Sequence, residues 1–223
     1  MAKHLRSRYR RLAQAQRATF EPDLATSLNT LSIRLSESGD WPGALRAIEE
    51  AVQRYRRLAQ AQPAFFEPDL ARSLNTLSNR LTNSGDRPGA LRAIEEAVQR
   101  YRRLAQAQPA AFEPDLAMSL KNLSIQLYNS GDRPGALRAI EEAVQIRRRL
   151  AEAQSAAFEP DLATSLYNLS IQLRDSGDRS GALRAIEEAV QIRRRLAEAQ
   201  PAAFEADLAS SLQVLEWLIK ESD

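Results

Sequence analysis

Apolar residues recur along the chain at spacings of three and four, the pattern of one face of a helix. One stripe is formed by Leu24, Leu28, Leu31 and Leu35, and a second by Ala44, Leu45, Ile48, Ala51, Val52, Tyr55 and Leu58. Gly39 and Asp40 stand between the two stripes. Glycine accepts the left-handed conformation that ends many helices, and aspartate often caps the helix that follows. The pattern predicts two helices, roughly residues 22–38 and 42–62.

This pair of stripes returns every 46 residues. The phrase Phe-Glu-Pro-Asp-Leu-Ala begins at Phe20, Phe66, Phe112 and Phe158, and a version with Ala in place of Pro begins at Phe204. In the four full copies, 32 of the 46 positions are identical, so these positions are expected to build the scaffold. A fixed period of this length is typical of stacked repeats, which bury their apolar faces against their neighbours.

The repeat predicts one array over residues 1–223. We expect a partial repeat with only a second helix at 1–19, full repeats at 20–65, 66–111, 112–157 and 158–203, and a terminal first-type helix at 204–223. The partial repeat is inferred because residues 9–16 match the end of the second helix at 55–62. The last helix carries the apolar segment Leu-Glu-Trp-Leu-Ile, which is unlike the polar cap of a solenoid.

The repeated residues resemble the tetratricopeptide repeat family. Its helix-turn-helix spacing is matched in every copy, in the first by Leu28, Leu31, Leu35, Gly39, Ala44, Leu45, Ile48 and Ala51. The unit of 46 residues is longer than the usual length of about 34 and is similar to the repeats of kinesin light chains and bacterial signalling proteins. The resemblance implies an all-α, right-handed α-solenoid of stacked antiparallel helix pairs, a superhelix that serves as a protein-interaction scaffold.

Composition points away from catalysis, cofactors and membranes. The chain has a formal net charge of +2, no cysteine and a single histidine, His4, so a histidine-based triad, a thiolate site and a His cluster for a metal are not expected. The glycines are turn residues of each repeat, and no phosphate-binding Gly-rich loop is present. No apolar run reaches the roughly 20 residues of a membrane span. We expect a cytoplasmic, non-enzymatic protein without a cofactor.

The copies differ most on one face of the first helix, which we call the variable face. Its positions follow spacings of three, four and three and lie away from the leucine stripe. In the family that the chain resembles, first helices line the concave surface and contact bound peptides. The resemblance therefore implies that a partner is bound by Thr26, Asn29, Ile33, Ser36, Arg72, Asn75, Asn79, Thr82, Met118, Lys121, Ile125, Tyr128, Thr164, Tyr167, Ile171 and Arg174.

The variable face mixes apolar and cationic side chains, which suits an extended or helical peptide with apolar anchors and some acidic character. The alternative is drift at exposed positions, with the isoleucines packing against neighbouring first helices. Against drift, the exposed face of the second helix is nearly invariant, apart from an exchange of Arg54-Tyr55 for Ile146-Arg147. A clamp for a chaperone C-terminal carboxylate is disfavoured, because Ile125 and not Asn follows Lys121 by one turn.

Two further interpretations remain. Arginines recur near the end of each second helix, at 56–57, 102–103, 147–149 and 193–195, and such a stripe binds phosphates in some proteins. No aromatic residues interleave with it, so we favour ion pairs with glutamates and aspartates of neighbouring helices and do not expect nucleic acid as a partner. The alternative function is end-to-end self-association into oligomers or filaments through the apolar ends.

Overall fold

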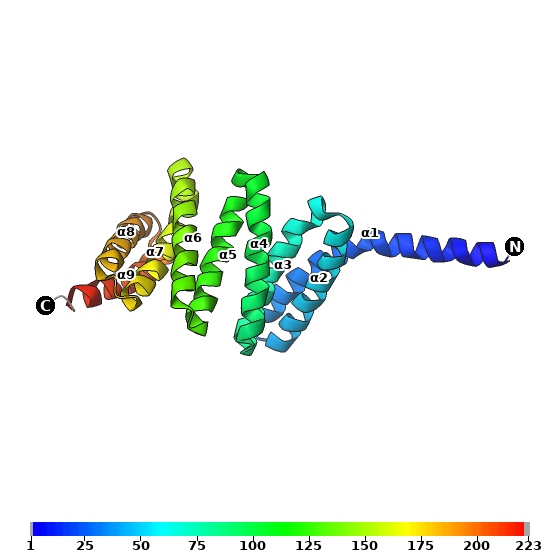
Figure 1. Ribbon diagram of the computed structural model, residues 1–223, viewed down its shortest axis with the longest axis horizontal. Coiled ribbons are helices and arrows are strands. Elements are labelled where there is room, and N and C mark those ends of the chain that lie inside the picture. The colour runs from blue at the N-terminus through cyan, green and yellow to red at the C-terminus, as the bar shows by residue number, and fades with distance from the viewer. Residues whose placement is uncertain (1, 221–223) are drawn as a thin grey trace. The chain divides into compact units, whose positions relative to one another are not determined.

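The computed structural model describes the backbone of residues 2–220 and the side chains of residues 20–154 and 157–220. Over this part of the chain there are nine helices and no strand (Figure 1). The first-type helices are α1 (Ala2–Glu37), α3 (Pro63–Ser84), α5 (Pro109–Ser130), α7 (Ser155–Asp175) and α9 (Pro201–Lys220). The second-type helices are α2 (Trp41–Ala61), α4 (Arg87–Ala107), α6 (Arg133–Ala153) and α8 (Arg179–Ala199).

The chain forms two compact units, Met1–Arg100 and Tyr101–Asp223, and α4 runs from one into the other. In the first unit, α2 packs on both α1 and α3. In the second unit, α5 packs on α6, α6 on α7, α7 on α8 and α8 on α9. Within each unit these helices contact their neighbours in sequence, and the predicted all-α class of stacked helix pairs is confirmed.

The turns between first and second helices form as the sequence predicts. Gly39 has a φ of +85°, and the Asp40 N–H donates to the Leu35 carbonyl over 2.8 Å. The Asp40 carboxylate accepts a hydrogen bond from the Gly43 N–H at 2.9 Å, which caps α2. The same positive φ returns at Gly85, Gly131 and Gly177, and the same cap at Asp86, Asp132 and Asp178.

The predicted start of the first-type helices is wrong, because α3, α5 and α7 begin five residues earlier and α1 begins at Ala2. The sequence pattern places it at the second proline of each junction, but α3 begins at Pro63, with Pro68 inside the helix. The N–H groups of Phe65 and Phe66 donate to the Gln62 carbonyl and so start the helix upstream. Pro68 lies early in the helix, where its missing N–H withdraws one hydrogen bond from the Ala64 carbonyl and the helix continues.

The second-helix stripe is confirmed as core, since Ala44, Ile48 and Ala51 are fully buried and their counterparts repeat this burial. The leucine stripe is also buried at Leu70, Leu116 and Leu162. In α1, however, Leu24 is 42% exposed and Leu31 is 46% exposed. The predicted partial repeat at 1–19 lies outside the residues whose side chains are described, and it stays a prediction, as does the division into repeats.

Candidate functional site

The variable face lies on α1, α3, α5 and α7 at matching positions. Thr26, Ile33, Arg72 and Asn79 are exposed, whereas Asn29, Ser36, Thr82, Met118, Lys121, Ile125, Tyr128, Thr164, Tyr167, Ile171 and Arg174 are half-buried. Asn75 is buried, with 4% of its surface exposed. Most of the predicted positions therefore keep surface that a partner can reach, and Asn75 offers little.

In the unit Met1–Arg100, polar members of the variable face make internal hydrogen bonds. The Asn29 amide donates to the Ser73 hydroxyl at 2.7 Å and so links α1 to α3. The Thr26 hydroxyl lies 2.9 Å from the Tyr55 hydroxyl and links α1 to α2. These side chains stabilise helix packing, which limits their capacity to bind a partner.

In the unit Tyr101–Asp223, one end of the variable face is a charged network around Asp175. Its carboxylate accepts a hydrogen bond from the Tyr128 hydroxyl, pairs with Arg174 at 2.6 Å and pairs with Arg133 at 3.2 Å. The Arg133 guanidinium also stacks 3.7 Å from the centre of the Tyr128 ring. Burial alone raises the pKa of the Asp175 carboxyl, but the bonds from Tyr128 and Arg174 and the nearby arginine charges lower it overall.

The middle of this face in the same unit is formed by Met118, Lys121 and Ile125 on α5 and by Tyr167 and Ile171 on α7. All five side chains are half-buried. Burial lowers the pKa of the Lys121 ammonium, and the positive charge of Arg147 lowers it further, against the opposing effect of Asp161. The Arg193 guanidinium lies 5.2 Å from the centre of the Tyr167 ring. These positions combine apolar and aromatic side chains with the cationic groups of Lys121 and Arg193.

The exchange of Arg54-Tyr55 for Ile146-Arg147 moves a guanidinium across the second helix. Arg54 pairs with Glu50 at 2.6 Å and with Glu21 at 3.2 Å, while its neighbour Tyr55 is buried. At the matching positions in α6, Ile146 is buried and the charge passes to Arg147, which is only 2% exposed. The exchange repeats in α8 as Ile192 and Arg193.

The buried arginines hold the next first helix. The Arg147 guanidinium donates to the Asp161 carbonyl at 2.7 Å and to the Ser165 hydroxyl. Arg193 makes the same bonds to the Asp207 carbonyl at 2.7 Å and to Ser211 at 2.6 Å. Burial lowers the pKa of both guanidinium groups, which nevertheless stay charged at neutral pH because free arginine titrates far above it.

The outward-facing arginines are paired with glutamates of neighbouring helices, as the favoured interpretation predicts. These pairs are Arg56–Glu96, Arg102–Glu142 and Arg148–Glu188 between successive second helices, and Arg57–Glu21, Arg149–Glu113 and Arg195–Glu159 between second and first helices. Pairing within the protein balances the charge of the stripe, and exposed pairs of this kind each contribute about 0–1 kcal/mol to stability.

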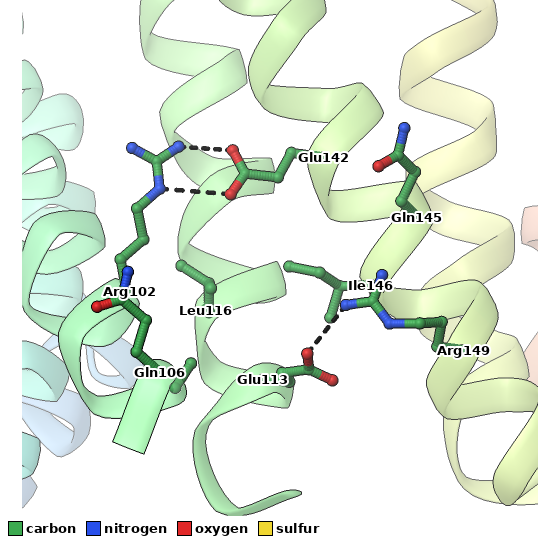
Figure 2. A pocket seen from close by; sticks show the side chains of 9 residues that line it. Arg102, Gln106, Glu113, Leu116, Glu142, Gln145, Ile146 and Arg149 are labelled. Atoms are coloured by element: carbon green, nitrogen blue, oxygen red, sulfur yellow. Dashed lines mark hydrogen bonds and ion pairs between the residues drawn. The ribbon is translucent and has the colours of Figure 1, made fainter. Parts of the chain in front are cut away.

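Two cavities open between these ion pairs in the unit Tyr101–Asp223, and we call them the outer cavities. The first has a volume of about 400 Å³ and an apolar floor that includes Leu116 and Ile146. Figure 2 shows Arg102–Glu142 and Arg149–Glu113 at its rim. The second, of about 320 Å³, has the floor residues Leu162 and Ile192 and the equivalent rim.

Comparison of the copies does not indicate the outer cavities, because most lining residues are repeat-identical and belong to the predicted scaffold. The usable signal was the paired exchange at 146–147 and 192–193, which replaces a charged lining residue by isoleucine. Among the described residues there is no cluster of acidic or histidine side chains that could hold a metal. No helix in that part of the chain is long and apolar enough to cross a membrane.

Comparisons with known proteins agree with the repeat pattern. A family model described as tetratricopeptide repeat matches residues 24–62, 70–108, 116–156 and 162–201. No curated protein matches the chain. Among solved structures, BtubC (BKLC) from P. vanneervenii is 23% identical with a TM-score of 0.72, over 97% of this chain and 79% of the other.

A second solved structure has a similar fold. It contains the nearly identical TPR-like repeats of a putative kinesin light chain from Podosopora anserina, in a form with one substitution. It is 21% identical with a TM-score of 0.65, over 91% of this chain and 93% of the other. At these identities, the two structures show a shared fold.

Proposed function

Because the chain belongs to the tetratricopeptide repeat family, we propose that it is a non-catalytic scaffold that binds a peptide or protein segment on the variable face. Repeats of this family generally mediate protein–protein interactions. The centre of the proposed site is formed by Met118, Lys121, Ile125, Tyr167 and Ile171. The remaining positions of the variable face extend it along the first helices.

The observation that carries this proposal is the half-burial of those five side chains on α5 and α7. An apolar surface held by rigid helices can take apolar anchors of a partner without reorganising first, which reduces the entropic cost of binding. At the corresponding positions in the other unit, Asn29 is already bonded to Ser73 and Asn75 is buried. The partner is therefore expected to contact α5 and α7 most strongly.

Lys121 indicates that the proposed partner carries a negative charge. Its ammonium lies close enough to Arg147 for the two positive charges to repel each other, and Asp161 supplies a nearby negative charge. A carboxylate from the partner would stabilise the charged ammonium in this half-buried position. We expect a segment with apolar side chains and an acidic residue that binds beside Lys121.

The test compares partner capture by the parent chain and by the variant Lys121→Asn/Tyr167→Asn. Asparagine occupies this position in the first two copies, as Asn29 and Asn75, so the variant keeps a residue that the fold accepts. Proteins that bind the parent protein are captured from a native lysate and quantified by mass spectrometry. Captured partners are expected to fall at least about tenfold, the effect of losing roughly 1.4 kcal/mol of binding free energy.

A matched control places two asparagines on the exposed face of the second helices, as Gln53→Asn/Gln99→Asn. The control should retain the partners, and circular dichroism should show both variants folded. Unchanged capture by Lys121→Asn/Tyr167→Asn would contradict binding on α5 and α7.

End-to-end self-association is a second candidate function. It is supported by the exposure of Leu24 and Leu31, whose counterparts in the fourth copy, Leu162 and Leu169, are 5% and 9% exposed. It is also supported by Trp217 and Ile219 on α9, which are 40% and 51% exposed. Light scattering over a concentration series tests it. A mass that grows in the parent but not in Leu24→Ser/Ile219→Ser supports contact through the ends, and equal growth in both argues against it.

A further inference from the structure

The outer cavities and the exposed Phe65 side chain are complementary features of one chain. We propose that Phe65 of one molecule inserts into an outer cavity of a second copy. This contact uses no residue of the variable face and is separate from the proposed scaffold function. It is also separate from contact through the ends of the chain.

The cavities have the chemistry that an aromatic ring requires. In the first, Ala105, Leu116 and Ile146 are apolar and at most 8% exposed. The guanidinium groups of Arg102 and Arg149 lie at the rim, where Glu142 and Glu113 hold them at 2.5 and 2.9 Å. A ring on this floor buries apolar surface, and its face can lie against a rim guanidinium, which is attracted to the negative face of an aromatic ring.

The paired exchange accounts for the apolar floor. At the position of Ile146, α4 carries Arg100, whose guanidinium bonds Glu67 at 2.6 Å and Glu96 at 2.8 Å. Glu113 and Glu142 are the counterparts of those two glutamates one repeat later. With isoleucine in place of arginine, the long charged side chain is missing from this place, and Glu113 and Glu142 keep only their pairs with the rim arginines.

Phe65 is the most exposed large apolar side chain that the structure describes, at 73%. It lies in the first turn of α3, beside the junction with α2. The other copies carry Ala111, Ala157 and Ala203 at this position, so the fold does not need an aromatic residue there. Exposing a phenylalanine to water is unfavourable, and a second molecule relieves this by covering it.

Each chain presents one Phe65 and two outer cavities, so the contact joins unlike surfaces and gives either a reciprocal dimer or a growing chain. One side chain in one cavity buries much less than the roughly 1,200 Å² of a stable interface. The association is therefore weak, with an expected Kd of about 0.1–1 mM.

Sedimentation equilibrium of the full chain, from low concentration up to about 1 mM, tests the proposal. The parent mass should rise above the monomer value of 24.9 kDa as concentration increases. Two variants should stay at the monomer mass. Phe65→Ala introduces the alanine that the other copies have at this position, and Ile146→Arg/Ile192→Arg introduces the arginine found at the matching positions 54 and 100. The introduced guanidinium groups can reach the counterparts of the glutamates that bind Arg100.

Mixing the two variants gives the sharpest readout. Phe65→Ala keeps both cavities and Ile146→Arg/Ile192→Arg keeps the phenylalanine, so the mixture should form complexes although neither variant does so alone. Gln53→Arg/Gln99→Arg adds the same charge to exposed positions of α2 and α4 and should associate like the parent.

Three results would overturn the proposal. They are a parent that stays monomeric at every concentration, a Phe65→Ala variant that associates as the parent does, and a mixture that stays monomeric. The second result would leave contact through the ends as the route of association. None of these results depends on partner capture by the variable face, so the scaffold proposal stands or fails separately.

Discussion

Single residues set the ends of the second helices, and Gly135 shows why a glycine is needed there. Its N–H donates to the Asp132 carboxylate at 2.9 Å, and a Cβ at this position would collide with the same carboxylate. We expect Gly135→Ala to displace the cap and to lower the free energy of unfolding by about 1–2 kcal/mol. Urea denaturation followed by circular dichroism measures the change.

Asp132→Asn is the control for this prediction, because asparagine keeps an oxygen that can accept the same bond. It should lose much less stability than Gly135→Ala. Equal losses in the two variants would mean that the charge of Asp132, and not the space beside it, is what the turn requires.

The buried arginines Arg147 and Arg193 stand where the first two copies have tyrosine, and their surroundings would accept a tyrosine unequally. Tyr55 is hydrogen-bonded to Thr26 in its own repeat, and the residue at the position of Thr26 is Thr164 in the repeat of Arg193 and Met118 in the repeat of Arg147. Arg193→Tyr therefore has a threonine at the position that binds Tyr55, whereas Arg147→Tyr has a methionine there. We expect Arg147→Tyr to be the less stable variant by about 1 kcal/mol, measured by urea denaturation. A reversed order would contradict this account of the exchange.

The Asp175 network predicts a dependence of stability on pH. The pKa of its carboxyl is lowered in the folded protein, so the charged form contributes stability that is fully present above the ordinary value of 3.8 and is lost as pH falls below it. Tyr128→Phe removes one bond that lowers this pKa. The stability difference between parent and Tyr128→Phe should shrink as pH falls from neutral to about 3, as measured by thermal unfolding. A constant difference would contradict the prediction.

At the scale of the helix, the junctions between second and first helices depend on a single residue. Gln154 has φ −147° and ψ 78°, close to the −142° and 75° of Gln62, although Ser155 follows it where Pro63 follows Gln62. Ser155 is the first residue of α7, the position at which the fixed φ of proline suits a helix. We expect Ser155→Pro to stabilise the protein by about 0.4–1 kcal/mol, since proline restricts the unfolded chain.

The reverse change, Pro109→Ser, is the control for this element and should lower stability by a similar amount. Both are measured by thermal unfolding. If Ser155→Pro destabilises the chain, the junctions are not equivalent and the turn before α7 has its own requirements.

Some features of the helices can be predicted from the sequence pattern and others cannot. The glycine turns, aspartate caps and buried stripes follow from local chemistry that four copies repeat, so the pattern predicts them. The start of α3 is misplaced by the pattern because Pro63 and Pro68 both suit the beginning of a helix, and the bonds from Phe65 and Phe66 to Gln62 decide between them. The local sequence alone does not decide which of the two prolines begins the helix.

For the whole molecule, the candidate site was only partly predictable. The variable face was found because its residues differ between copies, but the internal bonds of Asn29 and Thr26 depend on packing between helices that a single helix pattern does not contain. The outer cavities are not predicted by comparing the copies, for the opposite reason. Their rim residues are identical in the copies, and a cavity arises from how helices of successive repeats face one another.

The one-residue junctions described above have a consequence for how such a chain is rearranged. Gln62 alone separates α2 from α3, and Gln154 alone separates α6 from α7, so the connections between blocks have the same length. The contacts across the joint rely on groups that every block carries, such as the Glu and Ser partners of the arginines. We expect that a block can be duplicated next to itself without redesign of the joint. A third block inserted twice would present the Lys121 surface twice, so in this proposal the order of blocks determines where binding surfaces lie.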